Sequence, residues 1–77
     1  MMVTVNTEKL RAERISKGVS RYKLSLLSGL ASNAVFRMET KKQKVSFVRL
    51  QAVANVLNCD VNNLIYKENW YGRNENL

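Results

Sequence analysis

One short stretch in the middle of the chain combines side chains that can make directional polar contacts with a partner. It holds two short polar side chains, an aromatic ring and a guanidinium group: Ser32, Asn33, Phe36 and Arg37. Polar groups of these kinds form hydrogen bonds with base edges, and apolar groups contact the thymine methyl. On a helix, the four residues would lie opposite an apolar pair, Val35 and Met38. The stretch therefore has the chemistry of a base-reading surface.

Two short helices joined by a turn have to position these residues. Helical spacing begins at Ser20, is interrupted at Gly29 and resumes near Ser32. Ser25 and Ser28 are small and stand where the two helices would meet. Small residues at a contact let two helices cross closely at a large angle. The pattern thus predicts a helix pair whose second member, over residues 32–40, carries the polar row.

The rest of the chain repeats the same alternation of helix starts and stops. Side chains that favour helix starts stand at Asn6 or Thr7, Ser20, Ser46 and Asp60. Residue types that commonly end helices, glycine and asparagine, follow at Gly18, Gly29 and Asn58. We therefore expect an all-α domain of five helices over residues 1–66, followed by a polar tail over residues 67–77. In the tail, Trp70 and Tyr71 either fold back on the core or line a contact with a second copy.

Length and charge narrow the kind of partner. The 77 residues suffice for one small domain, and the formal net charge is +7. Residues 18–50 hold seven of the basic side chains against a single acidic one, Glu39. Concentrated positive charge favours an anionic partner such as nucleic acid, although a solvated basic face remains the alternative.

Composition argues against several function classes. The chain has one cysteine, Cys59, and no histidine, so an internal disulfide, a zinc finger and a Cys/His nucleophile are excluded. We find no carboxylate cluster for a metal and no phosphate-binding glycine loop, and therefore expect no enzyme and no cofactor. No bilayer-spanning run or secretory signal is evident, which leads us to expect a cytoplasmic protein. The basic residues lie across a turn and a loop, unlike those of a membrane-surface helix.

From Leu10 to Ile65 the sequence resembles the Cro/phage-repressor (Xre) helix-turn-helix family. The resemblance rests on an unbroken register of residues: Leu10-Arg11, Arg14, Gly18-Val19-Ser20, Leu24-Ser25, Gly29-Leu30, Val35, Met38-Glu39, Ser46-Phe47, Leu50, Val53-Ala54, Leu57, Asp60-Val61 and Leu64-Ile65. The chain departs from the family pattern at several positions. Arg21 stands where glutamine is usual, Ser25 where alanine is common, and Ala31 replaces a Ser or Thr cap. Ser32 is thus a candidate cap as well as a base reader.

The resemblance implies a lambda-repressor-like fold that lays the helix over residues 32–40 in the major groove of DNA. Base-reading roles then fall on Ser32, Asn33 and Arg37. Arg37 would bind guanine, Asn33 would bind adenine, and Phe36 would either press on a thymine methyl or cover protein surface. Contacts to phosphates are implied for Ser20, Arg21, Lys23, Thr40, Lys42 and Lys44. For Arg37 and the loop lysines, an ordinary solvated charge is the alternative.

The resemblance also implies a structural ion pair and a mode of assembly. Arg14 and Glu39 would pair between the first helix and the base-reading helix and hold that helix in place. We therefore expect a regulator of transcription, in first place a repressor, that binds double-stranded DNA. Because one module this small reads few base pairs, we expect it to bind as a homodimer to a pseudo-palindromic operator. The rival interpretation is an antitoxin-like module whose main task is to bind another protein, with the Trp70/Tyr71 tail as the contact surface.

Overall fold

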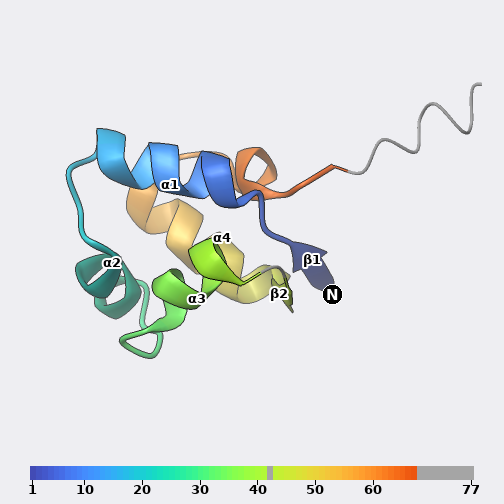
Figure 1. The fold of residues 1–77 in the computed structure, drawn as a ribbon, viewed down its shortest axis with the longest axis horizontal. Helices are drawn as coiled ribbons and strands as arrows, with labels where there is room; N and C mark the ends of the chain where they lie inside the picture. The colour runs from blue at the N-terminus through green and yellow to red at the C-terminus, as the bar shows by residue number, and fades with distance from the viewer. Residues whose placement is uncertain (42, 68–77) are drawn as a thin grey trace, which may run out of the picture.

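The computed structural model describes residues 1–41 and 43–67, which form a mainly helical domain (Figure 1). In chain order its elements are β1 (Met2–Thr4), α1 (Thr7–Ser16), α2 (Arg21–Leu27), α3 (Ala34–Thr40), β2 (Lys44–Ser46), α4 (Phe47–Leu57) and η1 (Val61–Leu64). The expected helical fold is confirmed, but the expected count of five α-helices is wrong. There are four in the described residues, because Val61–Leu64 forms a 3₁₀ turn. The predictions for Lys42, Trp70 and Tyr71 lie outside the described residues.

A small antiparallel sheet, which the sequence patterns did not predict, joins the N-terminal segment to the segment after α3. β1 pairs with β2, so that Val3 lies opposite Val45, and both valines pack against the core. The N-terminal segment that contains β1 also pairs with residues near the end of the described chain. Val5 forms a β-bridge with Ile65, and the Tyr66 N–H donates a hydrogen bond to the Thr4 carbonyl oxygen at 2.8 Å. Three-residue strands are too short to produce a recognisable alternation in the sequence.

Most helix starts are capped as the sequence predicts. The side chains of Asn6, Ser20, Ser46 and Asp60 each accept a backbone N–H of the turn that follows. The third helix is the exception. It begins at Ala34 rather than Ser32, its N-cap is Asn33, and the Asn33 side chain makes no capping bond. The expectation that Ser32 caps this helix is therefore wrong.

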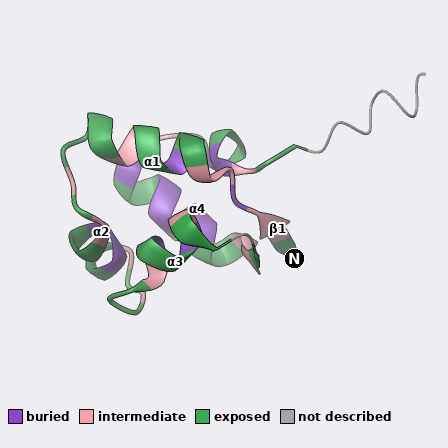
Figure 2. Ribbon diagram, in the orientation of Figure 1, coloured by how far each residue is buried: buried purple, intermediate pink, exposed green. Residues whose placement is uncertain are grey.

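The helix α4 packs against α2, β2 and η1 and supplies much of the core (Figures 1 and 2). Its inward stripe is closed to solvent because apolar residues recur at helical spacing on one side. Leu24 of α2 and Val35 of α3 are also fully buried, which locks the two short helices against the same core. The buried apolar residues are Val5, Leu10, Leu24, Val35, Met38, Leu50, Val53, Ala54, Leu57, Val61 and Leu64. No helix in the described part is long and apolar enough to cross a membrane.

Candidate nucleic-acid interface

The four residues with base-reading chemistry form one exposed row, which we call the outward row (Ser32, Asn33, Phe36 and Arg37). Ser32 and Asn33 lie in the turn before α3, and Phe36 and Arg37 lie on α3 itself. All four are exposed, and the large apolar residue Phe36 has a relative accessibility of 47%. The opposite side of α3 holds the buried Val35 and Met38. The structure thus brings the predicted residues together on the solvent side of α3 and of the turn before it.

The start of α3 is capped from the neighbouring helix. The Ser25 hydroxyl of α2 accepts the backbone N–H of Val35 at 2.9 Å and donates to the Arg21 carbonyl at 2.8 Å. Ser25 is completely buried, so its hydroxyl satisfies an N–H that water cannot reach. One side chain therefore replaces the missing Asn33 cap and joins the two helices. The sequence marks Ser25 only as a small residue and does not reveal this bond.

The far end of α3 is held by a charged cluster of Arg14, Arg21 and Glu39, here called the Glu39 cluster. Arg14 of α1 donates from Nε to Glu39 Oε2 at 2.7 Å and from Nη2 to Oε1 at 3.1 Å. A third bond runs from Arg14 Nη1 to the Val19 carbonyl at 3.1 Å. The Glu39 side chain is only 2% exposed, and that of Arg14 is 11% exposed. The paired fork of an arginine on a buried carboxylate fixes both position and orientation.

A second arginine, assigned to a phosphate contact from the sequence, also reaches Glu39. The Nε of Arg21 donates to Glu39 Oε1 at 2.9 Å. Its guanidinium carbon lies 5.3 Å from the centre of the Phe36 ring, within the range of a cation–π contact. Arg21 therefore touches both the inner and the outer side of α3.

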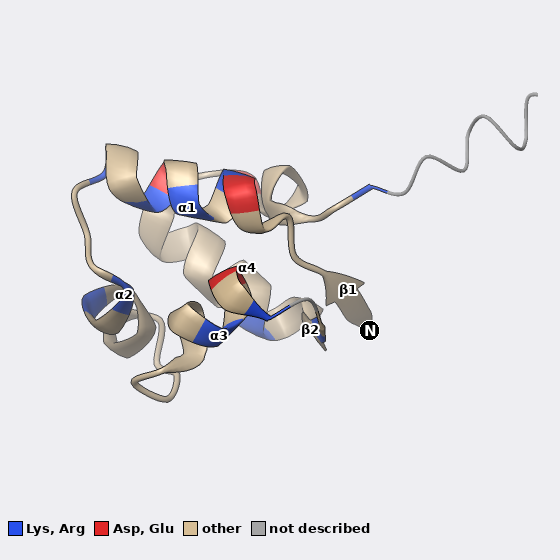
Figure 3. Ribbon diagram, viewed as in Figure 1, with Lys and Arg blue, Asp and Glu red and all other residues tan. Residues whose placement is uncertain are grey.

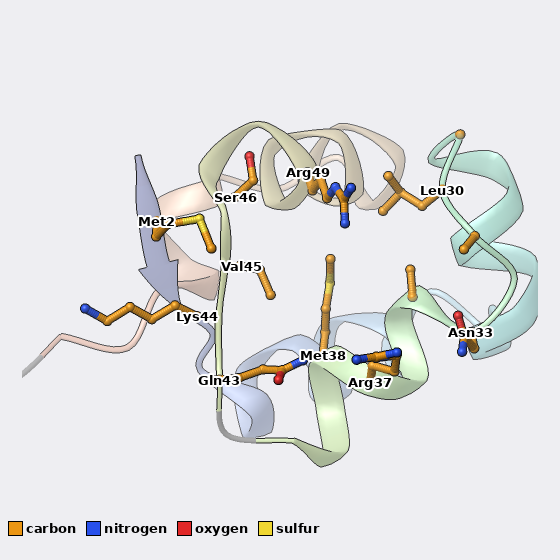
Figure 4. Close-up of a pocket in the computed structure, with 13 residues that line it drawn as sticks. Met2, Leu30, Asn33, Arg37, Met38, Gln43, Lys44, Val45, Ser46 and Arg49 are labelled. Atoms are coloured by element: carbon orange, nitrogen blue, oxygen red, sulfur yellow. The ribbon is translucent and has the colours of Figure 1, made fainter.

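A basic hollow borders the outward row. Arg37 of α3 and Arg49 of α4 line it from opposite walls, the Met38 side chain points into it, and Gln43 lies on the same side as Arg37 (Figure 4). The Lys44 side chain points away from its centre. Arg49 and Gln43 did not stand out in the sequence as site residues. Arg49 was visible there only as one charge among many, because nothing local relates position 49 to position 37.

The phosphate candidates surround this surface. Ser20 and Lys23 lie at the start of α2, Thr40 is the last residue of α3, and Lys44 is the first residue of β2. Figure 3 shows basic residues on α2 and α3 and near β2. Lys23 and Lys44 are exposed and extend into solvent. Thr40 is also exposed, but its hydroxyl donates to the Phe36 carbonyl at 2.7 Å. Glu39 is the one acidic side chain among residues 18–41 and 43–50, and the cluster buries it. The solvent side of these elements is consequently positive.

The single cysteine follows the end of α4, partly buried against the core. Burial raises the pKa of the Cys59 thiol, and the nearby carboxylate of Glu13 adds to the effect. The neutral thiol thus acts as a small packing group. Among the described residues, no group of three or more potential ligands could hold a metal ion.

Comparison with known proteins gives a consistent result. The chain matches the helix-turn-helix family model over residues 10–64. The restriction-modification controller protein C.AhdI from Aeromonas hydrophila is 32% identical, with a TM-score of 0.68 over 74% of this chain and 86% of that protein. A hypothetical transcription factor, NHTF from Neisseria, shares the fold at 21% identity, with a TM-score of 0.72 over 92% of this chain and 79% of that protein. No curated protein sequence matches significantly.

Proposed function

Since this chain belongs to the helix-turn-helix family of DNA-binding regulators, we propose that it is a sequence-specific repressor that reads double-stranded DNA with α3. In this proposal α3 enters the major groove, and the outward row contacts the base edges. A protein bound in this way occupies the duplex and prevents other proteins from binding at the same site. The controller protein C.AhdI, similar to this chain in sequence and fold, supports a regulatory role.

One observation carries the proposal: α3 is attached firmly on its inner side and exposes base-reading chemistry on its outer side. Ser25 holds the start of the helix, and Glu39 holds its end. Between them, Asn33 and Arg37 are exposed, with polar groups that match adenine and guanine edges. A helix that is fixed before binding loses little conformational freedom on entering the groove.

Contacts to the phosphates would position the module on the duplex. We assign them to Ser20, Lys23, Thr40, Lys42 and Lys44, and we add Arg49 because it borders the same hollow as Arg37. Such contacts supply affinity without reading sequence, since every nucleotide has a phosphate. Arg21 is not in this set, because Glu39 and Phe36 already engage its guanidinium.

The regulator would bind as a homodimer to two half-sites about one helical turn apart. A chain of net charge +7 can pair with its own copy only where like charges do not meet. The outer side of α4 comes closest to this condition. Val48, Gln51, Ala52, Asn55 and Val56 are uncharged, and the one charged residue of the helix, Arg49, borders this side and lines the hollow beside Arg37. Val48 is 74% exposed, so a second copy would cover apolar surface there. The variant Val48→Asp should therefore shift the protein toward monomer in sedimentation equilibrium.

The experiment that tests the function is selection of binding sites from a pool of random duplex DNA, at two salt concentrations. We expect a palindromic motif, and we expect Arg37→Ala to relax one position in each half-site. Arg11→Ala is the matched control, since Arg11 is an exposed arginine on α1. It should leave the motif unchanged.

Either result is informative. A palindrome, together with a steep fall of affinity with salt, supports major-groove reading backed by phosphate contacts. Weak, salt-sensitive binding without a motif would reject sequence-specific regulation. The rival interpretation as a partner-binding module would then be tested by removing residues 67–77.

A further inference from the structure

The two contacts of Arg21 connect the inner side of α3 to its outer side. On the inner side its Nε bonds Glu39 at 2.9 Å. On the outer side its guanidinium carbon lies 5.3 Å from the centre of the Phe36 ring. The side chain is one-third exposed, with a relative accessibility of 33%. One side chain of α2 is thus held by a buried carboxylate and covers an aromatic ring of the outward row.

Neutralising Glu39 does not require Arg21. Arg14 alone already meets both carboxylate oxygens, at 2.7 and 3.1 Å. Adding Arg21 leaves the cluster with one excess positive charge beside a carboxylate that is 2% exposed. What Arg21 adds is geometry, because the Nε of its rigid, planar guanidinium is bonded to Glu39 while the guanidinium carbon lies over the Phe36 ring.

Phe36 is the residue that gains from this geometry. It is the one aromatic side chain of the outward row, and 47% of it is exposed. A ring so exposed has few packing contacts to select one rotamer. A guanidinium fixed beside it supplies the missing restraint, since the cation is attracted to the ring face.

We propose that Arg21 is a positioning residue for base recognition: Glu39 holds Arg21, and Arg21 holds the Phe36 ring in the orientation that meets a thymine methyl. Arg21 thereby sets the base preference at one position of the half-site without touching the base. The inference rests on the proposed function, because it requires that the outward row contacts DNA. It also differs from the phosphate contact that the sequence suggests for Arg21.

Salt dependence and base preference distinguish a positioning residue from a phosphate contact. A side chain that neutralises a phosphate weakens all sequences alike when it is lost, and the salt dependence falls by about one charge. A positioning residue leaves the salt dependence unchanged and weakens one base preference. The conservative variant separates the roles further, because lysine keeps the charge but lacks the planar guanidinium.

The test compares Arg21→Gln, Arg21→Lys and Phe36→Ala with Lys23→Gln, a neighbouring exposed candidate for a phosphate contact. Affinity is measured by titrating duplexes that carry each of the four bases at the position relaxed by Phe36→Ala. The titrations are repeated over a range of salt concentrations. Circular dichroism of each variant, before and after binding, establishes that the compared proteins are folded.

We expect Arg21→Gln to reduce the preference at that position by about tenfold, the size of one mismatched base pair. The salt dependence should stay as in the unaltered protein, and Arg21→Lys should not restore the preference. In the double variant Arg21→Gln/Phe36→Ala, the loss of base preference at that position should equal the loss in Phe36→Ala alone. Lys23→Gln should instead lower the salt dependence by about one charge at every sequence.

Two results would overturn the inference. One is a uniform loss of affinity for Arg21→Gln that Arg21→Lys restores, which would make Arg21 a phosphate contact. The other is an unchanged base preference in a folded Arg21→Lys variant, which also remains informative if Arg21→Gln does not fold. Failure of the proposed function would look different, because the unaltered protein itself would then show no base preference.

Discussion

The two sides of α3 are built on opposite principles. On the inner side, Val35 is fully buried and Glu39 is almost so, and each has partners from another helix. On the outer side, Asn33 and Arg37 are exposed. The side chains on the inner side fix the helix to its neighbours, whereas the side chains on the outer side leave polar groups available to a partner.

Residues on the inner side should therefore determine the stability of the domain, and residues on the outer side should determine which DNA sequence it recognises. Changes on the inner side should unfold the domain or displace α3, and DNA binding should then fall for all sequences. Changes on the outer side should leave the fold intact and alter which sequence is bound. Residues that link the two sides, such as Arg21, should show intermediate behaviour.

The largest effect is expected when Glu39 is truncated. Glu39→Ala leaves two arginines facing a buried gap, and removing one partner of a buried pair costs about 3–5 kcal/mol. The free energy of unfolding in urea should fall by that order, and specific DNA binding should be lost with it. Glu8→Ala removes an exposed carboxylate from the first turn of α1 and should cost less than about 1 kcal/mol. Equal losses for the two variants would contradict the structural role of the cluster.

The next largest effect concerns the bond between α2 and α3. Ser25→Ala leaves the buried Val35 N–H without an acceptor, which should cost about 1–3 kcal/mol of unfolding free energy. Thermal unfolding followed by circular dichroism measures the loss. Ser28→Ala is the matched control, because its hydroxyl bonds only the Leu24 carbonyl of its own helix. If both serines proved equally dispensable, Ser25 would not be the cap of α3.

On the outer side, Arg37→Ala should change recognition and not stability. Its unfolding free energy should stay within about 0.5 kcal/mol of the unaltered value, as for most surface changes. Discrimination at one base pair should fall by about 1–3 kcal/mol if Arg37 binds guanine. Competition titrations with operator variants measure this change. A uniform loss over all variants would instead make Arg37 a backbone contact.

The smallest effect is expected for the peripheral charges. Lys44→Ala should lower the salt dependence of DNA binding by about one charge, with base preference unchanged. Fluorescence anisotropy at several salt concentrations provides the measurement. The exposed Lys9 of α1 gives the control, since Lys9→Ala should leave the salt dependence as it is. Identical slopes for all three proteins would remove Lys44 from the interface.

Local features of the sequence predicted much of the fold correctly. The caps at Ser20, Ser46 and Asp60 and the left-handed end at Asn58 occur as expected, because a cap involves residues only two to five positions apart. The outward row was also visible, since helical spacing alone places Phe36 and Arg37 opposite Val35 and Met38. The pairing of Arg14 with Glu39 followed from family resemblance rather than from any local pattern.

What the sequence by itself determined is therefore the approximate positions of the four α-helices, their buried stripes and the chemistry that α3 turns outward. Only the tertiary structure decided how α3 is held: by Ser25 across the turn, by the second arginine on Glu39, and beside Arg49 of α4. It also decided the pairing of β1 with β2, whose residues are some forty positions apart. These contacts join residues distant in sequence, so they depend on how the packed core brings the helices together, and no local pattern encodes that.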